Sequence, residues 1–124
     1  MDRMVELAKQ FFDTVERGDV NALKEYYAPN AKIWHNTDEQ EQTPDDNVQT
    51  LQGFVGRIRD RRYGDRRVHA FPGGFVHQHT LSGVRTKDGV AVRLTACIVC
   101  MVENGRITRL DEYFDSEAVA RFRA

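Results

Sequence analysis

Two titratable side chains lie on predicted strands of this 124-residue chain, where an apolar surround would let them move protons. His35 ends a short apolar strand, and its imidazole titrates near neutral pH, so it can give or take a proton there. On the last predicted strand Thr108, Leu110, Glu112 and Phe114 share one face by the period of two. If that face is concave, Glu112 is a candidate general base. We expect His35 and Glu112 to be catalytic; the competing interpretation of His35 is a buried histidine bonded to a backbone carbonyl.

His77 and His79 are two residues apart and therefore share one face of their predicted strand. We expect His79 to be a third catalytic group that hydrogen-bonds a substrate, with His77 nearer the rim. Together with His35 they could form a nitrogen-rich metal site, but an H-x-H pair is common and we predict no metal. The alternative register points Gln78, a candidate substrate-binding residue, inward and turns His79 outward, because a one-residue slip reverses every side chain.

Further side chains are candidates for binding a hydrophobic small molecule. Trp34, Phe54 and Tyr63 would supply aromatic walls, and Asn36 would place an amide at the mouth of a pocket. The competing interpretation of the aromatic residues is ordinary core packing. Trp34 in particular faces away from His35 if their strand is regular.

Helical signals dominate the first half of the chain. Apolar residues at helical spacing predict one helix over 4–17 and another that begins after Thr43 and whose apolar stripe ends at Ile58. Thr43 is a suitable cap, and Pro44 suits the first helical position. A short helix is expected after Asp19.

Strand signals dominate the second half, where turn residues separate apolar stretches. The strands expected are 31–35, 68–71, 74–84, 90–102 and 106–114, and a closing helical turn is expected over 116–124. Because the helical segments come first and most strands follow, the order favours an α+β fold over a parallel βαβ sheet. An antiparallel sheet with about three N-terminal helices on one side can curl into an open cone, whose concave face makes an apolar pocket.

Charge and composition restrict the partners. Six arginines between residues 57 and 67 would suit phosphates, but acids are interleaved and the net charge is −1. We interpret this segment as helix-surface arginines paired with neighbouring acids, and we expect no nucleic-acid partner. Cys97 and Cys100, three apart on a strand, should face opposite sides and pack as thiols.

The size and hydropathy of the chain fit one domain over residues 1–124. A content of 40% hydrophobic and 30% charged residues is typical of a globular protein. No apolar run reaches the roughly 20 residues of a membrane helix, and the N-terminal segment is charged. We expect a cytoplasmic protein with no membrane partner.

Four motifs resemble a known family. They are Tyr27-Ala28-Pro29-Asn30-Ala31, Ile33-Trp34-His35-Asn36, Gln78-His79-Thr80-Leu81-Ser82-Gly83, and the ending from Gly105 to Asp115. They resemble the SnoaL-like, polyketide cyclase-like branch of the nuclear transport factor 2-like superfamily, whose relatives include ketosteroid isomerases and limonene-epoxide hydrolases. The resemblance implies a cone-shaped α+β barrel, a site that works without metal or cofactor, and a homodimer formed through the outer face of the sheet.

The chain departs from both named relatives at their catalytic positions. Phe11 and His35 stand where ketosteroid isomerases have a tyrosine and an aspartate. Thr80, Ser82 and Glu112 stand where the epoxide hydrolases have an arginine and two aspartates, so only Glu112 keeps a carboxylate.

Three functions remain open from the sequence. The first is a cofactor-independent isomerase, cyclase or hydrolase that acts on a hydrophobic carbonyl or epoxide compound. The second is a non-catalytic binding or dimerisation module, in which Arg109, Asp111 and Tyr113 would lie on a polar dimer interface. The third is a metal-dependent lyase or oxygenase built on clustered histidines.

Overall fold

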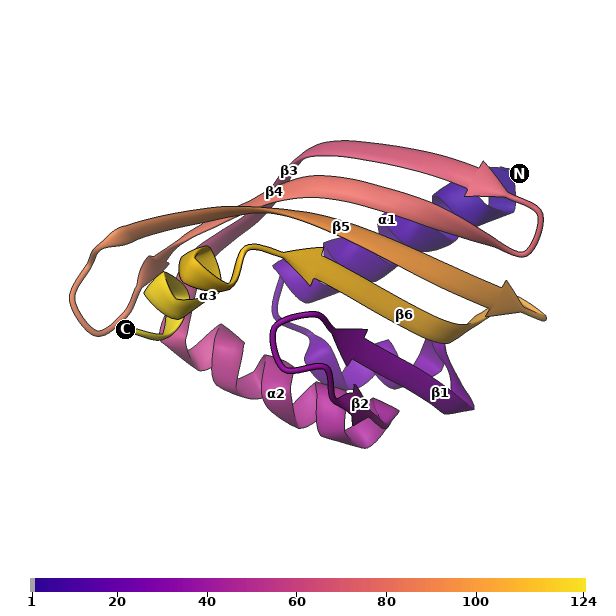
Figure 1. The fold of residues 1–124 in the computed structure, drawn as a ribbon, viewed down its shortest axis with the longest axis horizontal. Coiled ribbons are helices and arrows are strands. Elements are labelled where there is room, and N and C mark those ends of the chain that lie inside the picture. Colours follow the sequence, from indigo (N-terminus) through magenta and orange to yellow (C-terminus); the bar gives the residue numbers. More distant parts are fainter. Residues whose placement is uncertain (1) are drawn as a thin grey trace.

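A six-stranded curved sheet, flanked by helices, organises residues 2–124, which the computed structural model describes (Figure 1). The helices are α1 (Asp2–Glu16), the 3-10 helix η1 (Val20–Glu25), α2 (Pro44–Arg57) and α3 (Ser116–Arg123). The strands are β1 (Tyr27–His35), β2 (Glu41–Gln42), β3 (Ile58–Phe71), β4 (Gly74–Arg85), β5 (Ala91–Glu103) and β6 (Arg106–Phe114). The predicted α+β class is confirmed.

The strand order in the sheet is β2-β1-β6-β5-β4-β3. Strands β3 to β6 form the predicted antiparallel meander, whereas β1 pairs with β6 in parallel. One face of the sheet is covered, with α1 behind β3 and β4 and α2 beside β1 (Figure 1). The curvature and the one-sided cover give the predicted open cone.

Alternation along the strands decides which residues enter the core. In β4 every second side chain from Phe75 to Leu81 is buried, and β5 buries Val92, Leu94 and the alternate residues that follow. Helix α1 lies against this inner face with Phe11 and Phe12, which are 3% and 2% exposed. Cys100 is buried on the inner face and Cys97 is half-buried on the other, so the predicted opposite orientation is confirmed.

Helix α2 begins as its sequence predicts. The Thr43 side chain accepts a hydrogen bond from the Asp46 backbone N–H, and the Asp46 carboxylate accepts one from the Thr43 N–H. Pro44 occupies the first turn, where a missing N–H costs nothing. The helix ends at Arg57, before Ile58, which was predicted to lie on its apolar stripe and instead opens β3.

The arginine-rich segment is a strand, and its prediction as helix surface is wrong. Asp60 and Asp65 have φ angles of 54° and 51°, and the pairing with β4 shifts register at both places. Such bulges insert an extra residue and so hide the alternation by which a strand is recognised. The pairing with acids holds in part: Arg59 contacts Asp60 at 2.7 Å.

The first strand also begins earlier than predicted, at Tyr27 and not at Ala31. It runs through Pro29 because the pairing with β6 is irregular between Tyr27 and Lys32, so no ladder hydrogen bond is needed there. Strands β4 and β5 each extend one residue beyond the predicted end, and β6 has the predicted bounds. Within the part of the chain described, every helix is too short or too polar to cross a membrane.

Candidate functional site

The parallel pairing of β1 with β6 brings His35 and Glu112 together. The two residues are register partners, and both side chains point to the concave face. Nε2 of His35 lies 3.1 Å from Oε1 of Glu112, with 16% and 17% of the two side chains exposed. The His35 ring also stacks on the Phe114 ring at 5.8 Å between centroids. The two strand ends therefore hold an imidazole and a carboxylate in hydrogen-bond contact within a largely apolar surround.

The pair favours a charged imidazole. Burial alone would lower the pKa of His35, but the hydrogen bond and negative charge of Glu112, with a contribution from Asp38, outweigh it. The net pKa of His35 is above its ordinary value of 6.5. The contact thus favours the protonated imidazole beside the Glu112 carboxyl group, a pair within which one proton can move.

Two cavities meet at this pair. The smaller, of about 40 Å³, is lined mostly by buried residues and is called the inner chamber; the larger, of about 120 Å³, has exposed residues in its lining and is called the outer chamber. Four residues line both chambers: His35, Leu51, Tyr63 and Glu112. The pair is therefore accessible from two sides.

The inner chamber has aromatic walls with a few polar groups. Phe11, Phe12 and Tyr27 line it, and the Tyr27 hydroxyl donates a 2.9 Å hydrogen bond to Oδ1 of Asn47. Burial raises the pKa of the Tyr27 and Tyr63 hydroxyls far above their ordinary values, so both remain protonated donors. At about 40 Å³ the chamber has room for water, which needs roughly 10–15 Å³, but not for a ring.

The outer chamber has the space for a small ligand. Its apolar lining is contributed by α2, β4, β5, β6 and α3 and consists of Leu51, Phe54, Leu81, Leu94, Phe114, Val119 and Phe122. Its polar rim consists of Thr37, Asp38, Gln42, Thr50, Arg57 and Arg123. Its volume of about 120 Å³ compares with the roughly 150 Å³ of a protein cavity that binds benzene.

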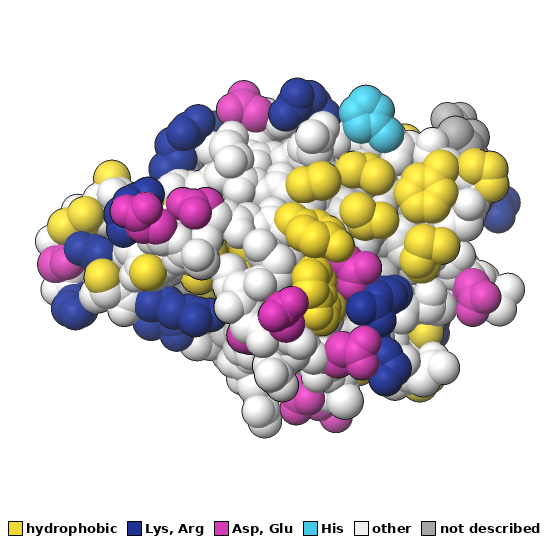
Figure 2. All heavy atoms as spheres, viewed as in Figure 1, with side chains coloured by type: hydrophobic (Ala, Val, Ile, Leu, Met, Phe, Trp, Pro, Cys, Tyr) yellow, Lys and Arg dark blue, Asp and Glu magenta, His cyan; other side chains and the backbone are white. Residues whose placement is uncertain are grey.

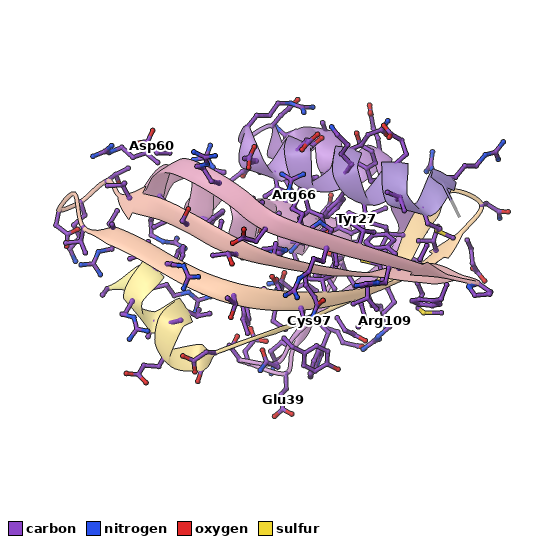
Figure 3. The ribbon with its side chains drawn as sticks, turned by 90° about the horizontal axis from the view of Figure 1, so that it is seen from above. Tyr27, Glu39, Asp60, Arg66, Cys97 and Arg109 are labelled. Atoms are coloured by element: carbon purple, nitrogen blue, oxygen red, sulfur yellow. The ribbon has the colours of Figure 1, made fainter. Side chains whose placement is uncertain are left out.

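The predicted substrate-binding residues divide between the two faces of the sheet. Phe54 and Tyr63 line the chambers. Trp34 lies on the opposite face, where its ring contacts Tyr113 edge-on at 5.3 Å, and Gln78 lines a shallow surface depression there. Figure 3 shows the sheet from its edge, with Tyr27 on the side of α1 and with Cys97 and Arg109 on the other.

Asn36 has a clear structural task. Its side chain donates a hydrogen bond to the Phe114 carbonyl and accepts one from the Phe114 N–H, both at 3.1 Å. Its own N–H donates to the Glu112 carbonyl at 3.0 Å. Asn36 therefore continues the β1–β6 ladder one residue beyond His35 and fixes the backbone from the Glu112 carbonyl to Phe114.

His79 points inward, but it lies beneath α1 and not in the space of either chamber. Its Nδ1 is 3.0 Å from Nδ1 of His77, and both rings contact Phe12. His77 is fully buried and not near a rim, so that prediction is wrong. Burial lowers the pKa of His79 and, with the neighbouring imidazole, lowers that of His77 to about 3. These two neutral histidines are part of the α1–β4 packing.

The clustered-histidine hypothesis has no support from this arrangement. Among the side chains that the structure describes, no three from histidine, cysteine, aspartate and glutamate are placed to hold one metal ion.

Sequence reasoning missed several residues of the lining. Arg57 and Arg123 were not singled out, because one belonged to an arginine-rich run and the other to a short terminal helix. Asp38 lies in a loop that no periodicity describes. Leu51 was assigned to a helical stripe, and the signal that it lines a cavity is the proximity of α2 to β1 and β3, which only the fold reveals.

The family follows from the sequence match. Residues 8–110 match the model of the SnoaL-like domain. The chain belongs to the SnoaL-like family. The matched range contains His35 and most of the cavity, while Glu112 and α3 follow it directly.

Solved structures share the fold of this SnoaL-like domain at low sequence identity. A suggested polyketide cyclase from Xanthomonas campestris has a TM-score of 0.86 at 20% identity, over 98% of this chain and 97% of that one. A nuclear transport factor 2-like protein of unknown function from Burkholderia pseudomallei has a TM-score of 0.83 at 16% identity, over 98% of each chain. A ketosteroid isomerase-like fold from Catenulispora acidiphila, in complex with trimethylamine, has a TM-score of 0.82 at 10% identity, over 92% and 88%.

These likenesses establish the fold of the SnoaL-like domain. None of the curated proteins is similar enough in sequence to match it. The chemistry must therefore be argued from the chain's own site.

Proposed function

We propose that this SnoaL-like domain is an enzyme of the isomerase, cyclase or hydrolase type that uses His35 and Glu112 as an acid–base pair. Its substrate would be a hydrophobic carbonyl or epoxide compound, and no cofactor would be required. The observation that carries the proposal is the 3.1 Å pair at the wall that both chambers share. Such placement lets one reactant in each chamber reach the same two groups.

The pair supplies both halves of a proton transfer. For a carbonyl compound, the Glu112 carboxylate takes a proton from the carbon beside the carbonyl. The electron pair of that C–H bond forms a C=C bond, and the π pair of the carbonyl moves onto its oxygen. The His35 imidazolium then donates a proton to the oxygen or to another carbon. For an epoxide, Glu112 takes a proton from water while the water oxygen bonds to a ring carbon. The C–O bond of that carbon breaks, and the imidazolium protonates the released oxygen. Each cycle ends with the proton restored to the pair.

The geometry leaves room for these contacts. Among the described residues, none forms a hydrogen bond with Oε2 of Glu112 or with Nδ1 of His35. Tyr63 also lines both chambers and is 8% exposed, so its hydroxyl is a candidate donor to an oxygen that gains charge. The outer chamber limits the substrate to about the size of one ring.

The test follows proton transfer directly. Cyclohexanone in D₂O reports exchange of its α protons by NMR, and cyclohexene oxide reports ring opening. We expect His35→Asn and Glu112→Gln each to lower the catalysed rate by at least ~100-fold, the usual contribution of one positioned acid or base. The matched controls are His69→Asn and Asp111→Asn, which alter an exposed histidine and a carboxylate on the outer face. Folded site variants that keep the wild-type rate would exclude the proposal.

A ligand-binding module is the second candidate. Phe11, Phe12, Tyr27 and Tyr63 fill much of the closed end of the cone, as a non-catalytic domain would allow. Binding of the two ring compounds without exchange or ring opening would favour this function over the enzyme.

We also propose that a second copy of the chain covers the outer face of the sheet. Figure 2 shows hydrophobic side chains gathered on that face, and Met101 and Tyr113 are 42% and 46% exposed. Arg109 and Asp111, which pair with each other at 3.0 Å, lie beside them. An apolar strip next to both charges can meet its own copy about a two-fold axis. The test is sedimentation at about 100 μM protein, a concentration well above the usual dissociation constants of dimers. A chain that sediments as a monomer there would refute the dimer.

A further inference from the structure

The outer chamber opens between the ends of two helices that both carry arginine. Arg57 ends α2, Arg123 ends α3, and both line the chamber. Both also line an adjoining surface depression with Gln49, Thr50 and Gly53. Basic side chains gather at this junction of α2 and α3 in the space-filling view (Figure 2). A molecule that enters the outer chamber from this side therefore passes two guanidinium groups.

Neither guanidinium is neutralised by a neighbour. Among the described side chains, no carboxylate forms an ion pair with Arg57 or Arg123. Some arginines of the chain are paired, such as Arg66, which contacts Asp13 at 2.6 Å, and Arg85, which contacts Asp88 at 2.8 Å. Guanidinium groups match carboxylate and phosphate oxygens in charge and geometry.

The charged side chains that line the outer chamber have a net positive charge, even when the acidic ones are included. The charges of His35 and Glu112 cancel in the imidazolium–carboxylate pair, and Asp38 offsets one of the two arginines. One positive charge remains at the mouth. The field of Arg123 reaches the pair: burial and this guanidinium lower the pKa of His35, against the larger opposite effect of Glu112 and Asp38.

We propose that the outer chamber takes a small molecule with an apolar, ring-sized body and one anionic group, which Arg57 and Arg123 hold at the mouth. The body would lie among Leu51, Phe54 and Phe122, with its reactive carbon toward His35 and Glu112. This inference rests on the proposed function for the identity of the reactive end, but the anion site itself requires no turnover. The substrate class is thus a small ring compound that carries an anionic group besides its reactive carbonyl or epoxide, and a neutral ketone such as cyclohexanone would bind more weakly.

The ordinary role of the two arginines is a dipole effect. A cation in the last turn of a helix complements its negative end, and both residues occupy that turn. That role stabilises the helices without any preference among ligands. Two ligands that differ only in charge distinguish the two roles, because only an anion-binding role gives a preference for the charged ligand.

Benzoate and benzamide form such a pair, because they share one ring and differ in a carboxylate against an amide. We expect benzoate to bind the wild-type protein about tenfold more tightly than benzamide, because its carboxylate would form two partly solvated ion pairs with Arg57 and Arg123. The double variant Arg57→Gln/Arg123→Gln should bind both probes equally, and the benzoate preference should shrink as salt increases. Arg121→Gln, on α3 but outside the chamber lining, should keep the preference. Binding is measured by calorimetry and by chemical-shift changes of residues in the outer chamber.

Three outcomes would overturn the anion site: equal affinity for both probes in the wild-type protein, an unchanged preference in the double variant, or no binding of either probe at a few millimolar. Exchange of cyclohexanone, which has no anionic group, separates this failure from that of the proposed function. If the anion site is wrong but the acid–base pair is right, the exchange still depends on His35 and Glu112. If the double variant loses benzoate preference while cyclohexanone exchange persists, both proposals stand.

Discussion

Nε2 of His35 lies 3.1 Å from Oε1 of Glu112, and the parallel register of β1 and β6 places both side chains on the same face of the sheet. The contact joins the end of the first long strand to the end of the last. Its surroundings are apolar, with Leu51 and Tyr63 completing the shared wall of two chambers. The acid–base chemistry proposed for this SnoaL-like domain depends on that contact.

Tyr63→Phe should slow catalysis without unfolding the protein. Burial raises the pKa of the Tyr63 hydroxyl, which therefore remains a hydrogen-bond donor at the chamber wall. Removing a donor to an oxygen that gains charge costs roughly 10²–10³-fold in the best-studied sites, and we expect the lower end here because His35 also donates. The measurement is the exchange rate of cyclohexanone together with urea unfolding.

Tyr113→Phe is the matched control for Tyr63, because it removes a hydroxyl from the exposed outer face. The variant should match the wild-type protein in both measurements. An unaltered exchange rate in Tyr63→Phe would show that this hydroxyl takes no part in the reaction.

Much of this fold was predictable because its signals are local. The capping box at Thr43 and the alternation in β6 each depend on a few neighbouring residues, and both are present as predicted. The same alternation placed Glu112 on the inner face. Asp60 and Asp65 show where such reasoning fails: bulges at left-handed residues break the period of two, so a strand was mistaken for a helix surface.

The candidate site was predictable only in part because it is assembled by long-range pairing. His35 and Glu112 could be chosen by type and strand position, but their contact requires the β1–β6 register. His79 has the same residue type as His35, yet α1 covers it. The position of α1 depends on packing across the whole sheet, which no local pattern encodes. Arg123 reaches the chamber only because α3 folds back over β5.

Asn36→Ala should destabilise the protein and loosen the site. The variant removes two side-chain hydrogen bonds to the Phe114 backbone and leaves its N–H and C=O without these partners. We expect the free energy of unfolding to fall by about 1–3 kcal/mol, the range for unsatisfied, partly buried polar groups. Urea denaturation at pH 7 measures it, with the exposed Asn30→Ala as control. A loss no larger than that of the control would contradict the role given to Asn36.

The His77–His79 pair should make the protein sensitive to acid. In the unfolded chain these histidines gain protons below about pH 6.5, whereas the pKa of folded His77 is about 3. The unfolded state therefore binds more protons between these values, and the free energy of unfolding decreases as pH falls through that window. The slope is about 1.4 kcal/mol per pH unit for each extra proton bound.

Urea unfolding at several pH values between 7 and 4 measures this slope. His77→Gln/His79→Gln should be less stable at pH 7 and should show a shallower decline toward acid. His69→Gln, which changes an exposed histidine, should keep the wild-type slope. An undiminished decline in the double variant would mean that other groups cause the acid sensitivity.

NMR titration of the His35 Cε1–H signal, assigned with His35→Asn, measures the pKa of this imidazole and tests the His35–Glu112 pair without any substrate. The account predicts a pKa above 6.5 in the wild-type protein, with the stabilisation from the pair present below pH 6.5 and lost as pH rises through the folded value. In Glu112→Gln the His35 pKa should fall, because burial lowers it and the negative charge of Glu112 no longer raises it. A wild-type pKa at or below 6.5, or one that Glu112→Gln leaves unchanged, would show that the two residues do not share a proton and would contradict the account.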